Sequence, residues 1–271
     1  MADITKKQHF IPQMMLKFFT DGKDNRFWEY NLNSHLLTKK RTDEVFFQNL
    51  IYEVRDERGK YYYEPGKNSM EKGFGIIETD FSVFLGELIT ELDGSESIIC
   101  DNDRRDQICT WIAFMFARNP LVLKAIPLVA DEYNIELINK ISKAASFLKL
   151  MPKEIEDIRN DLMKGHITFL KASDEDCFVL SDFPVLFYGV PMHEWCYMPV
   201  SSKYAILVKK PDNALVNNNR CFVNKLSRVE TFGWNYRMYA LVLHSKESEF
   251  HAGNSVISEK KHVLEKLISV R

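Results

Sequence analysis

Apolar residues at spacings of three and four mark a long amphipathic helix between Met70 and Leu92, ended by Gly94. A repeat close to 3.6 residues places such side chains on one face of a helix. We therefore expect this face to be buried, with Lys72 and Glu87 exposed on the other side. The positions of the apolar face are Met70, Phe74, Ile77, Phe81, Leu85, Leu88 and Leu92.

Further helices are predicted on the C-terminal side of this one. The apolar spacing favours a second helix over 103–118, followed directly by Pro120, and a third over 131–150. A fourth begins at Pro152 and is ended by a glycine at its C-terminus. The region 70–165 is therefore predicted to be rich in helices.

Beyond residue 165 the pattern changes to short apolar or alternating runs separated by turn residues. These runs are "HITFLKA", "CFVLSD", "VLFYGV", "WCYMPV" and "KYAILVKK". Such runs are typical of antiparallel strands. We expect a helix in "NNNRCFVNKLSRVETFG", a last strand in "YRMYALVLH" and a closing helix in "SVISEKKHVLEKLISV". The region 166–243 is thus predicted to be rich in strands.

The N-terminal segment predicts smaller elements. Pro12 suits the first turn of a short helix, and strands are expected over 26–32 and 34–40. A short helix over 42–54 and a strand over 60–66 complete the set. Because strands and helices segregate along the chain, the predicted class is α+β. No linker is evident, so we expect one domain over 1–271, with the helical middle packed on a mainly antiparallel sheet from the C-terminal half.

Composition excludes few function classes. The 271 residues have 45% hydrophobic and 27% charged side chains and a net charge of -2, so any nucleic-acid site has to be a local patch. Five scattered cysteines without a CxxC pair support neither a zinc ribbon nor a disulfide framework, and they favour free thiols in a reducing compartment. No signal peptide and no run of about 18 apolar residues is found, so we expect a cytoplasmic protein without a membrane partner.

The common catalytic signatures are absent from the sequence. It contains no phosphate-binding loop, no dinucleotide-binding glycine motif, no H-E-x-x-H and no G-x-S-x-G. Candidate chemistry has to be found in weaker features. His9 lies just before the helix predicted at Pro12, where the partial positive charge of the helix N-terminus favours a neutral imidazole. It is a candidate general base or metal ligand, and a hydrogen-bonded structural histidine is the alternative.

Two carboxylates and one guanidinium are candidates in the helical region. Glu71 and Glu78 are two helical turns apart and point to nearly the same side. They could hold a hard cation or share acid and base roles, or they could be the solvated edge of the helix. Arg118 ends the second helix and could bind a phosphate or carboxylate, unless it only caps that helix.

The stretch "LSDFPV" places Ser181 and Asp182 at the end of a predicted strand, before a turn imposed by Pro184. Polar groups at strand ends are often functional, because they project into clefts. Ser181 is a candidate ligand-binding residue, and Asp182 is a candidate metal ligand or catalytic group. The alternative is that Asp182 forms a local Asx turn.

These candidates fall in an order that resembles a large, mainly bacterial family classed as a domain of unknown function. Its N-terminal pattern, H-(Y/F)-(V/I)-P-x-x-Y-L-x-x-F, is similar to "HFIPQMMLKFF", in which Met15 replaces the usual Tyr. The E-x6-E helix is matched by Glu71 and Glu78, and Q-x-x-R-(T/S)-P by "MFARNP". The strand end F-x-(S/T)-S-D-N-P-V is similar to "FVLSDFPV", and "MPVSS" stands where L-P-(L/I)-(S/T)-P is usual.

The resemblance implies that His9, Glu71, Glu78, Arg118, Ser181 and Asp182 belong to one site, but it brings no reaction with it. Two positions depart from the family pattern. Met115 stands at the usual Gln, and Phe183 stands at the usual Asn. If those amides contact a ligand in the family, this chain lacks both contacts.

Three functional interpretations follow and remain open. In the first, the protein is a cytosolic metal-dependent hydrolase, a nuclease or phosphodiesterase acting on nucleic acid or nucleotides. Glu71, Glu78 and Asp182 then hold Mg²⁺ or Mn²⁺, His9 is the general base and Arg118 stabilises phosphate charge. In the second, the same residues form a non-catalytic binding module for a small anionic ligand or a protein partner. In the third, they form a buried structural network.

Overall fold

The computed structural model describes most of the chain. The described residues are 6–22, 24–49, 51–52, 69–120, 122, 153, 155–188, 194–210, 219–245 and 255–270. The helix predicted over 131–150 and the strand predicted over 60–66 lie outside them. Within this part of the chain, helices and antiparallel or mixed sheets occur together, which confirms the α+β class.

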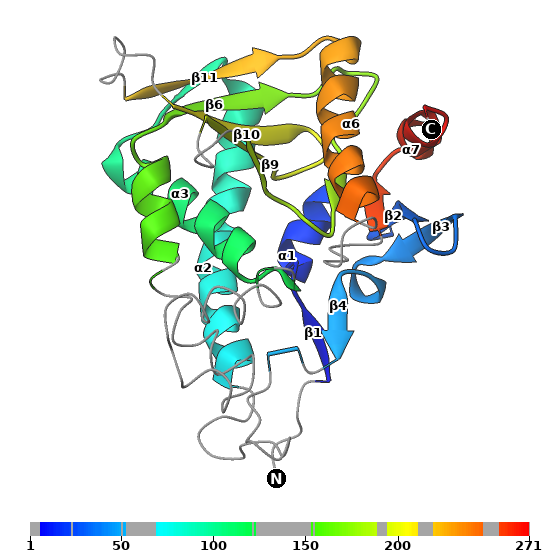
Figure 1. The fold of residues 1–271 in the computed structure, drawn as a ribbon. Coiled ribbons are helices and arrows are strands. Elements are labelled where there is room, and N and C mark those ends of the chain that lie inside the picture. The colour runs from blue at the N-terminus through cyan, green and yellow to red at the C-terminus, as the bar shows by residue number, and fades with distance from the viewer. Residues whose placement is uncertain are drawn as a thin grey trace.

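A six-stranded sheet forms the centre of the fold (Figure 1). All neighbouring strands are antiparallel except β11 and β6, which run parallel. Every residue of β10 except the last is buried, as expected of a strand covered on both faces. The strand order is β5 (Ser97–Ile99), β11 (Arg220–Lys225), β6 (His166–Lys171), β10 (Tyr204–Lys209), β9 (Trp195–Pro199) and β8 (Leu186–Tyr188).

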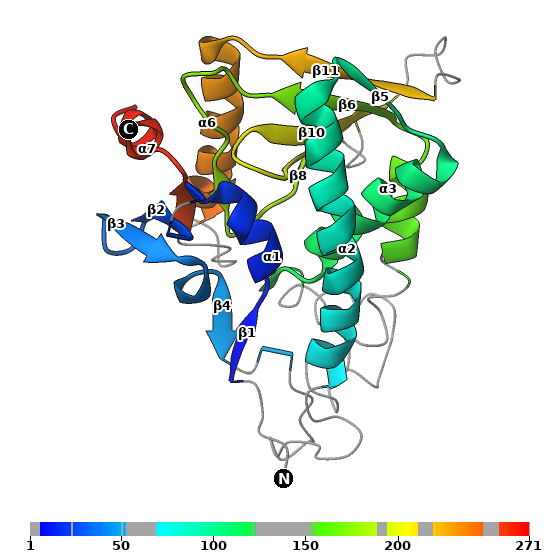
Figure 2. The ribbon, with the colours of Figure 1, turned by 180° about the vertical axis from the view of Figure 1, so that it is seen from behind.

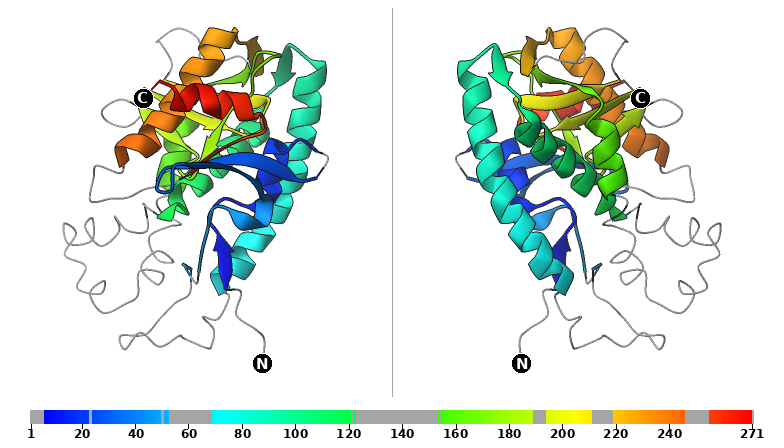
Figure 3. Two further views of the ribbon diagram at one scale, coloured as in Figure 1. Left: turned by 90° about the vertical axis from the view of Figure 1, so that its right-hand side faces the viewer. Right: turned by 90° about the vertical axis from the view of Figure 1, so that its left-hand side faces the viewer.

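Helices cover both faces of this sheet. On one face lie α2 (Ser69–Gly94), α3 (Asn102–Ala117) and a helix over 155–162, as Figure 2 shows from behind. On the other face lies α6 (Arg228–Ser245), with α7 (Lys261–Ile268) beyond it (Figure 3). Alternation along the strands divides the core accordingly. Val208 packs with the first group of helices and Leu207 packs with α6.

A second, four-stranded sheet joins distant parts of the chain. Its order is β3 (Leu36–Arg41), β2 (Arg26–Asn31), β12 (Ser255–Ser258) and β7 (Leu180–Ser181), with all pairs antiparallel. A short antiparallel pair, β1 (Lys7–His9) with β4 (Phe47–Asn49), lies beside it. The second sheet thereby brings residues from both ends of the sequence next to "LSDFPV".

The long helix is confirmed. Its apolar face is buried, with Phe74 at 3%, Phe81 at 9% and Leu85 and Leu88 at 0% exposure, and Ile77 is half-buried. Lys72 and Glu87 are exposed, as the spacing predicts. The ring of Phe81 packs 4.5 Å from that of Trp111 on α3, centroid to centroid. This contact ties the two helices together through their apolar faces.

Three predictions for the C-terminal part are wrong. Part of the helix expected over 217–233 is β11, in which Cys221 is buried and Phe222 is 51% exposed. The last strand expected over 236–244 lies in α6, so the strand-rich region predicted over 166–243 ends at Lys225. In α6 the buried residues Met238 and Val242 are four positions apart, which is a helical spacing.

A capping box explains where α6 begins. The backbone amide of Ser227 donates to Glu230 Oε2 at 2.8 Å, and the amide of Glu230 donates to Ser227 Oγ at 3.3 Å. This reciprocal arrangement satisfies amides that a helix N-terminus leaves without partners. This local signal marks the N-terminus of α6, whereas its dense apolar residues alone resemble a strand.

Two smaller predictions also need correction. Of the helix expected over 255–270, only Lys261–Ile268 is helical, because Ser255–Ser258 is fully buried as β12 between two other strands. Among the described residues of the helix expected over 42–54, Thr42–Glu44 is a 3-10 turn, η2, and Phe47–Asn49 is strand β4. Pairing with partners distant in sequence therefore overrides the local apolar spacing.

Candidate functional site

Arg118 is the centre of a buried polar network. It is the C-cap residue of α3 and is 1% exposed. Its Nη1 donates to Glu78 Oε1 on α2 at 2.6 Å, and its Nη2 donates to the backbone carbonyl of His9 at the end of β1. The guanidinium also lies 4.7 Å from the ring of Phe74 and 5.0 Å from that of Phe114. Arg118 therefore links three segments of the chain within a largely aromatic pocket.

Tyr52 belongs to this network and lies within electrostatic reach of Glu71. The Tyr52 hydroxyl donates to the carbonyl of Arg118 at 2.9 Å, and its backbone amide donates to the side chain of Gln8 at 2.8 Å. The pKa of Tyr52 is raised to about 12, mainly by burial and in part by the carboxylates of Glu71 and Glu78, against the opposing effect of Arg118. Tyr52 thus stays a hydrogen-bond donor at neutral pH.

Asp182 joins the network through the residue after Arg118. The side chain of Asn119 donates to the carbonyl of Asp182 at 2.7 Å. The Asp182 carboxylate, 6% exposed, accepts the backbone amide of Ser255 at 3.2 Å. Ser255 Oγ in turn donates to Glu29 at 2.6 Å. Asp182 therefore fastens β12 to the end of β7.

Ser181 forms its side-chain hydrogen bonds with residues outside this group. Its hydroxyl donates to the carbonyl of Phe183 at 2.7 Å and contacts the sulfur of Met238 at 3.0 Å. The side chain is fully buried. In this structure Ser181 shapes the turn before Pro184, and its role in ligand binding stays a prediction.

His9 is held in its neutral form. The pKa of His9 is lowered from 6.5 to about 4, mainly by burial and in part by the positive charges of Arg118 and Lys7. Its Nδ1 lies 3.5 Å from the amide nitrogen of Gln13, while its buried Nε2 has no hydrogen-bond partner among the described residues. A neutral ring with an available nitrogen can accept or donate a hydrogen bond to a ligand.

The structure thus brings the predicted residues together to different degrees. Arg118 contacts both Glu78 and the His9 backbone, Asp182 is reached through Asn119, and Glu71 interacts electrostatically with Tyr52. Ser181 is separate. That the group surrounds one open cleft stays a prediction.

The arrangement does not fit a preformed metal centre. Within the described ranges, no three His, Cys, Asp or Glu side chains are grouped so that they could hold a metal ion. Glu78 is bound to the Arg118 guanidinium, and Asp182 is bound to the amide of Ser255. Binding of Mg²⁺ or Mn²⁺ by Glu71, Glu78 and Asp182 therefore stays a prediction.

A polar pocket lies next to His9. Its volume is about 510 Å³, within the range of small-ligand sites. Arg26 on β2 and Arg41 on β3 are directly opposite each other in the antiparallel pair, so their side chains leave the same face. The pocket is lined by Gln13, Asp24, Asn25, Arg26, Arg41, Thr42 and Asp43.

Sequence reasoning missed several of these residues. Arg26 and Arg41 form a pair only because the hairpin register aligns them, and no motif spacing marks them. Asn119 had a visible signal, since it is a polar residue between a helix cap and Pro120. Tyr52 lies in the segment that was expected to be a helix, which hid its contact with Arg118.

Comparison with known proteins adds a family and no function. The model of a family described as "Protein of unknown function (DUF4238)" matches residues 7–235. This match confirms the resemblance to a domain of unknown function. Neither curated proteins nor solved structures yielded a match. No helix of the described part is long and apolar enough to cross a membrane.

Proposed function

The chain belongs to the DUF4238 family of proteins of unknown function, and we propose that it is a non-catalytic binding module for a small anionic ligand. One observation carries the proposal. Arg26 and Arg41 face each other across β2 and β3 and line the pocket beside His9. Two guanidinium groups on one face can bind a phosphate or carboxylate through paired hydrogen bonds.

The cost of pairing two cations supports a role in binding. Like charges directly opposite in a sheet destabilise it. Here Arg41 is paired with Asp43 at 3.1 and 3.4 Å, whereas Arg26 lies 3.8 Å from Asp24, and all four side chains are exposed so that water weakens both pairs. An anion bound between the guanidinium groups would relieve the remaining repulsion.

His9 would contribute an uncharged hydrogen-bonding group at the edge of this pocket. Gln13, which lines the pocket, contacts the imidazole Nδ1 at 3.5 Å. Asp43, another lining residue, also interacts electrostatically with His9. The Arg118 network would then act as the support that fixes the backbone of His9.

Thermal unfolding with inorganic phosphate tests this proposal, because a ligand that binds only the folded state raises the melting temperature. Phosphate should stabilise the wild type but not the double variant Arg26→Gln/Arg41→Gln. Arg220→Gln, which removes an exposed arginine on the other sheet, is the matched control and should respond like the wild type. An equal response in the double variant and the wild type would overturn the proposal.

A hydrolase acting on nucleic acid or nucleotides is the second candidate. It is favoured by the neutral imidazole of His9, which can accept a proton, and by Arg118, which binds both the Glu78 carboxylate and the His9 backbone carbonyl. It ranks second because a pKa of about 4 makes His9 a weak base at neutral pH.

Purified protein should be incubated with single- and double-stranded DNA, RNA and cyclic dinucleotides, with and without Mg²⁺ or Mn²⁺. Cleavage that His9→Ala abolishes and Gln13→Ala retains would support the hydrolase. If the wild type cleaves none of these substrates, the hydrolase is rejected.

A further inference from the structure

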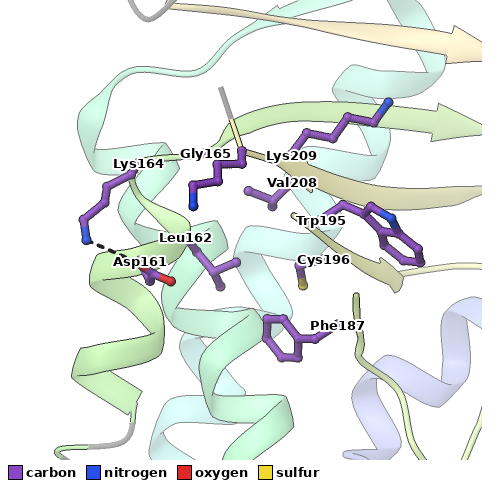
Figure 4. Close-up of a pocket in the computed structure, with 10 residues that line it drawn as sticks. Asp161, Leu162, Lys164, Gly165, Phe187, Trp195, Cys196, Val208 and Lys209 are labelled. Atoms are coloured by element: carbon purple, nitrogen blue, oxygen red, sulfur yellow. Dashed lines mark hydrogen bonds and ion pairs between the residues drawn. The ribbon is translucent and has the colours of Figure 1, made fainter. Parts of the chain in front are cut away.

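A separate cavity lies between the end of the helix over 155–162 and strands β8, β9 and β10 of the six-stranded sheet (Figure 4). Its volume is about 170 Å³. Leu162, Phe187, Cys196 and Val208 form its apolar interior, and their side chains converge in Figure 4. Neither the Arg118 network nor the Arg26 and Arg41 pocket contributes a lining residue.

Gly165 creates the close approach that forms one wall. A Cβ atom at this position would lie 2.4 Å from Val208 Cγ1 and 3.1 Å from the carbonyl oxygen of Leu162. Only glycine allows the turn to sit this close to β10 without displacing a neighbour. Arg105 Nη1 donates to the carbonyl of Gly165 at 2.7 Å and holds the turn in place. The turn at Gly165 is therefore held by Val208 of β10 on one side and by Arg105 on the other.

Positive charge dominates the residues around the cavity. Lys164, Lys209 and Lys210 are set against Asp161, and Glu194 lies nearby, where its carbonyl accepts the amide of Lys210. Lys164 is already paired with Asp161 at 3.1 Å. Lys210 is exposed and forms no ion pair with any described residue. The side chains of Lys209 and Trp195 extend away from Phe187 and Cys196 in Figure 4. The other two lysines that line the cavity, Lys164 and Lys210, therefore supply the positive charge at its rim.

The cavity size limits what can enter it. A cavity of about 150 Å³ lined by apolar side chains holds one benzene molecule. The present cavity, at about 170 Å³, is of the same size and has the flat ring of Phe187 on one side. Its interior offers no charged side chain, since the Cys196 thiol has a pKa raised by burial and stays protonated. A single planar ring fits these limits.

We propose that this cavity binds a one-ring aromatic anion. The ring would lie among Leu162, Phe187 and Val208, and the carboxylate or phosphate would stay at the rim near Lys210 and Lys164. The proposal does not depend on the pocket beside His9. The ligand there is defined by its charge alone, whereas this one requires a ring as well.

Four small molecules distinguish the contribution of the aromatic ring to binding from that of the negative charge. Benzoate and phenyl phosphate carry both features, benzyl alcohol carries only the ring, and acetate carries only the charge. In a titration followed by backbone amide resonances, benzoate and phenyl phosphate should shift Gly165 and Val208 in a saturable way. Benzyl alcohol and acetate should bind at least about tenfold more weakly, because each lacks one of the two contributions. Saturable shifts for phenyl phosphate but not benzoate would narrow the anion to phosphate.

Two variants test the assigned contacts. Lys210→Glu should weaken benzoate binding at least about fivefold, because it replaces an attraction with a repulsion. The control is Lys17→Glu, which reverses the charge of an exposed lysine that does not line the cavity and should leave benzoate binding unchanged. Phe187→Ala should weaken binding through loss of the ring contact, with folding verified by its melting temperature.

The Arg26→Gln/Arg41→Gln variant keeps the two proposals distinguishable, since it should bind benzoate as the wild type does. If no probe gives saturable shifts at the cavity residues, the proposal is wrong. The same holds if Lys210→Glu binds benzoate as tightly as the wild type.

Discussion

Replacing Arg118 with methionine removes the centre of the buried network while keeping most of its volume. Methionine can fill the space between Phe74 and Phe114, because it is unbranched and packs well against aromatic rings. The charge and both donated hydrogen bonds are lost. Glu78 keeps its carboxylate without the guanidinium, and the carbonyl of His9 loses its donor.

The expected loss of stability follows from these two bonds. Breaking a buried ion pair by removing one partner costs about 3–5 kcal/mol. Here Arg118 is 1% exposed but the Glu78 side chain is 26% exposed, so water can partly solvate the carboxylate that remains. We therefore expect Arg118→Met to lower the free energy of unfolding by about 3 kcal/mol, the lower end of this range. Most of this loss comes from the two charge-assisted hydrogen bonds.

Urea denaturation of Arg118→Met, Glu78→Gln and the double variant measures this contribution. The coupling energy between the two positions should exceed about 1 kcal/mol, as expected of residues in contact. The control is Arg104→Met, which removes a second arginine that links α3 to α2, through Glu91 at 2.7 Å. That pair is more exposed and should be worth about 1 kcal/mol or less. A loss below 1 kcal/mol for Arg118→Met, or no coupling, would refute the reasoning.

Three further predictions concern other parts of the fold. The pKa of His9 is about 4 in the folded protein and 6.5 in the unfolded chain. The contribution of the neutral ring to the free energy of unfolding is therefore complete above pH 6.5 and is lost as the pH falls to 4. Partial exposure reduces that contribution to about 1–2 kcal/mol. Between pH 6.5 and pH 4, the free energy of unfolding measured by urea denaturation should therefore fall more steeply for the wild type than for His9→Gln. Gly165→Ala should cost about 1–3 kcal/mol, since the new methyl group meets Val208 at 2.4 Å, and an unchanged melting temperature would contradict this. Phe81→Ala should cost about 3–5 kcal/mol through its packing on Trp111, and a loss below 1 kcal/mol would mean that the helix face is less well packed than described.

The sequence predicts the fold best where one face of an element is buried. The spacing in α2 distinguishes its buried Leu85 and Leu88 from the exposed Glu87, so the helix is correctly predicted. In α6 the apolar residues are too dense for such a distinction, and the same stretch is compatible with a strand. The strand β12 is short and completely buried, so its identity depends on the neighbours β2 and β7 and not on its own pattern.

The candidate site shows a similar limit. The residue types of His9, Glu78 and Arg118 mark them as candidates, but their contact joins positions up to 109 residues apart. In that contact His9 contributes its backbone carbonyl, which no side-chain pattern can reveal. The pairing of Arg26 with Arg41 likewise depends on hairpin register. Sequence therefore identified His9, Glu78 and Arg118 as candidates but neither the bonds between them nor the linking residues Tyr52 and Asn119.

Because β12 lies between β2 and β7, the four-stranded sheet cannot be completed until β12 has been synthesised. The bond from Ser255 to Glu29 spans 226 residues, and ribosomes add about 5–20 residues per second. Strand β2 is therefore synthesised roughly 10–45 s before the strand that completes its pairing. During that interval one edge of β2 has no partner from β12, and an open edge can pair with another chain. We expect aggregation during synthesis to start at β2, and faster translation of the intervening segment would reduce it.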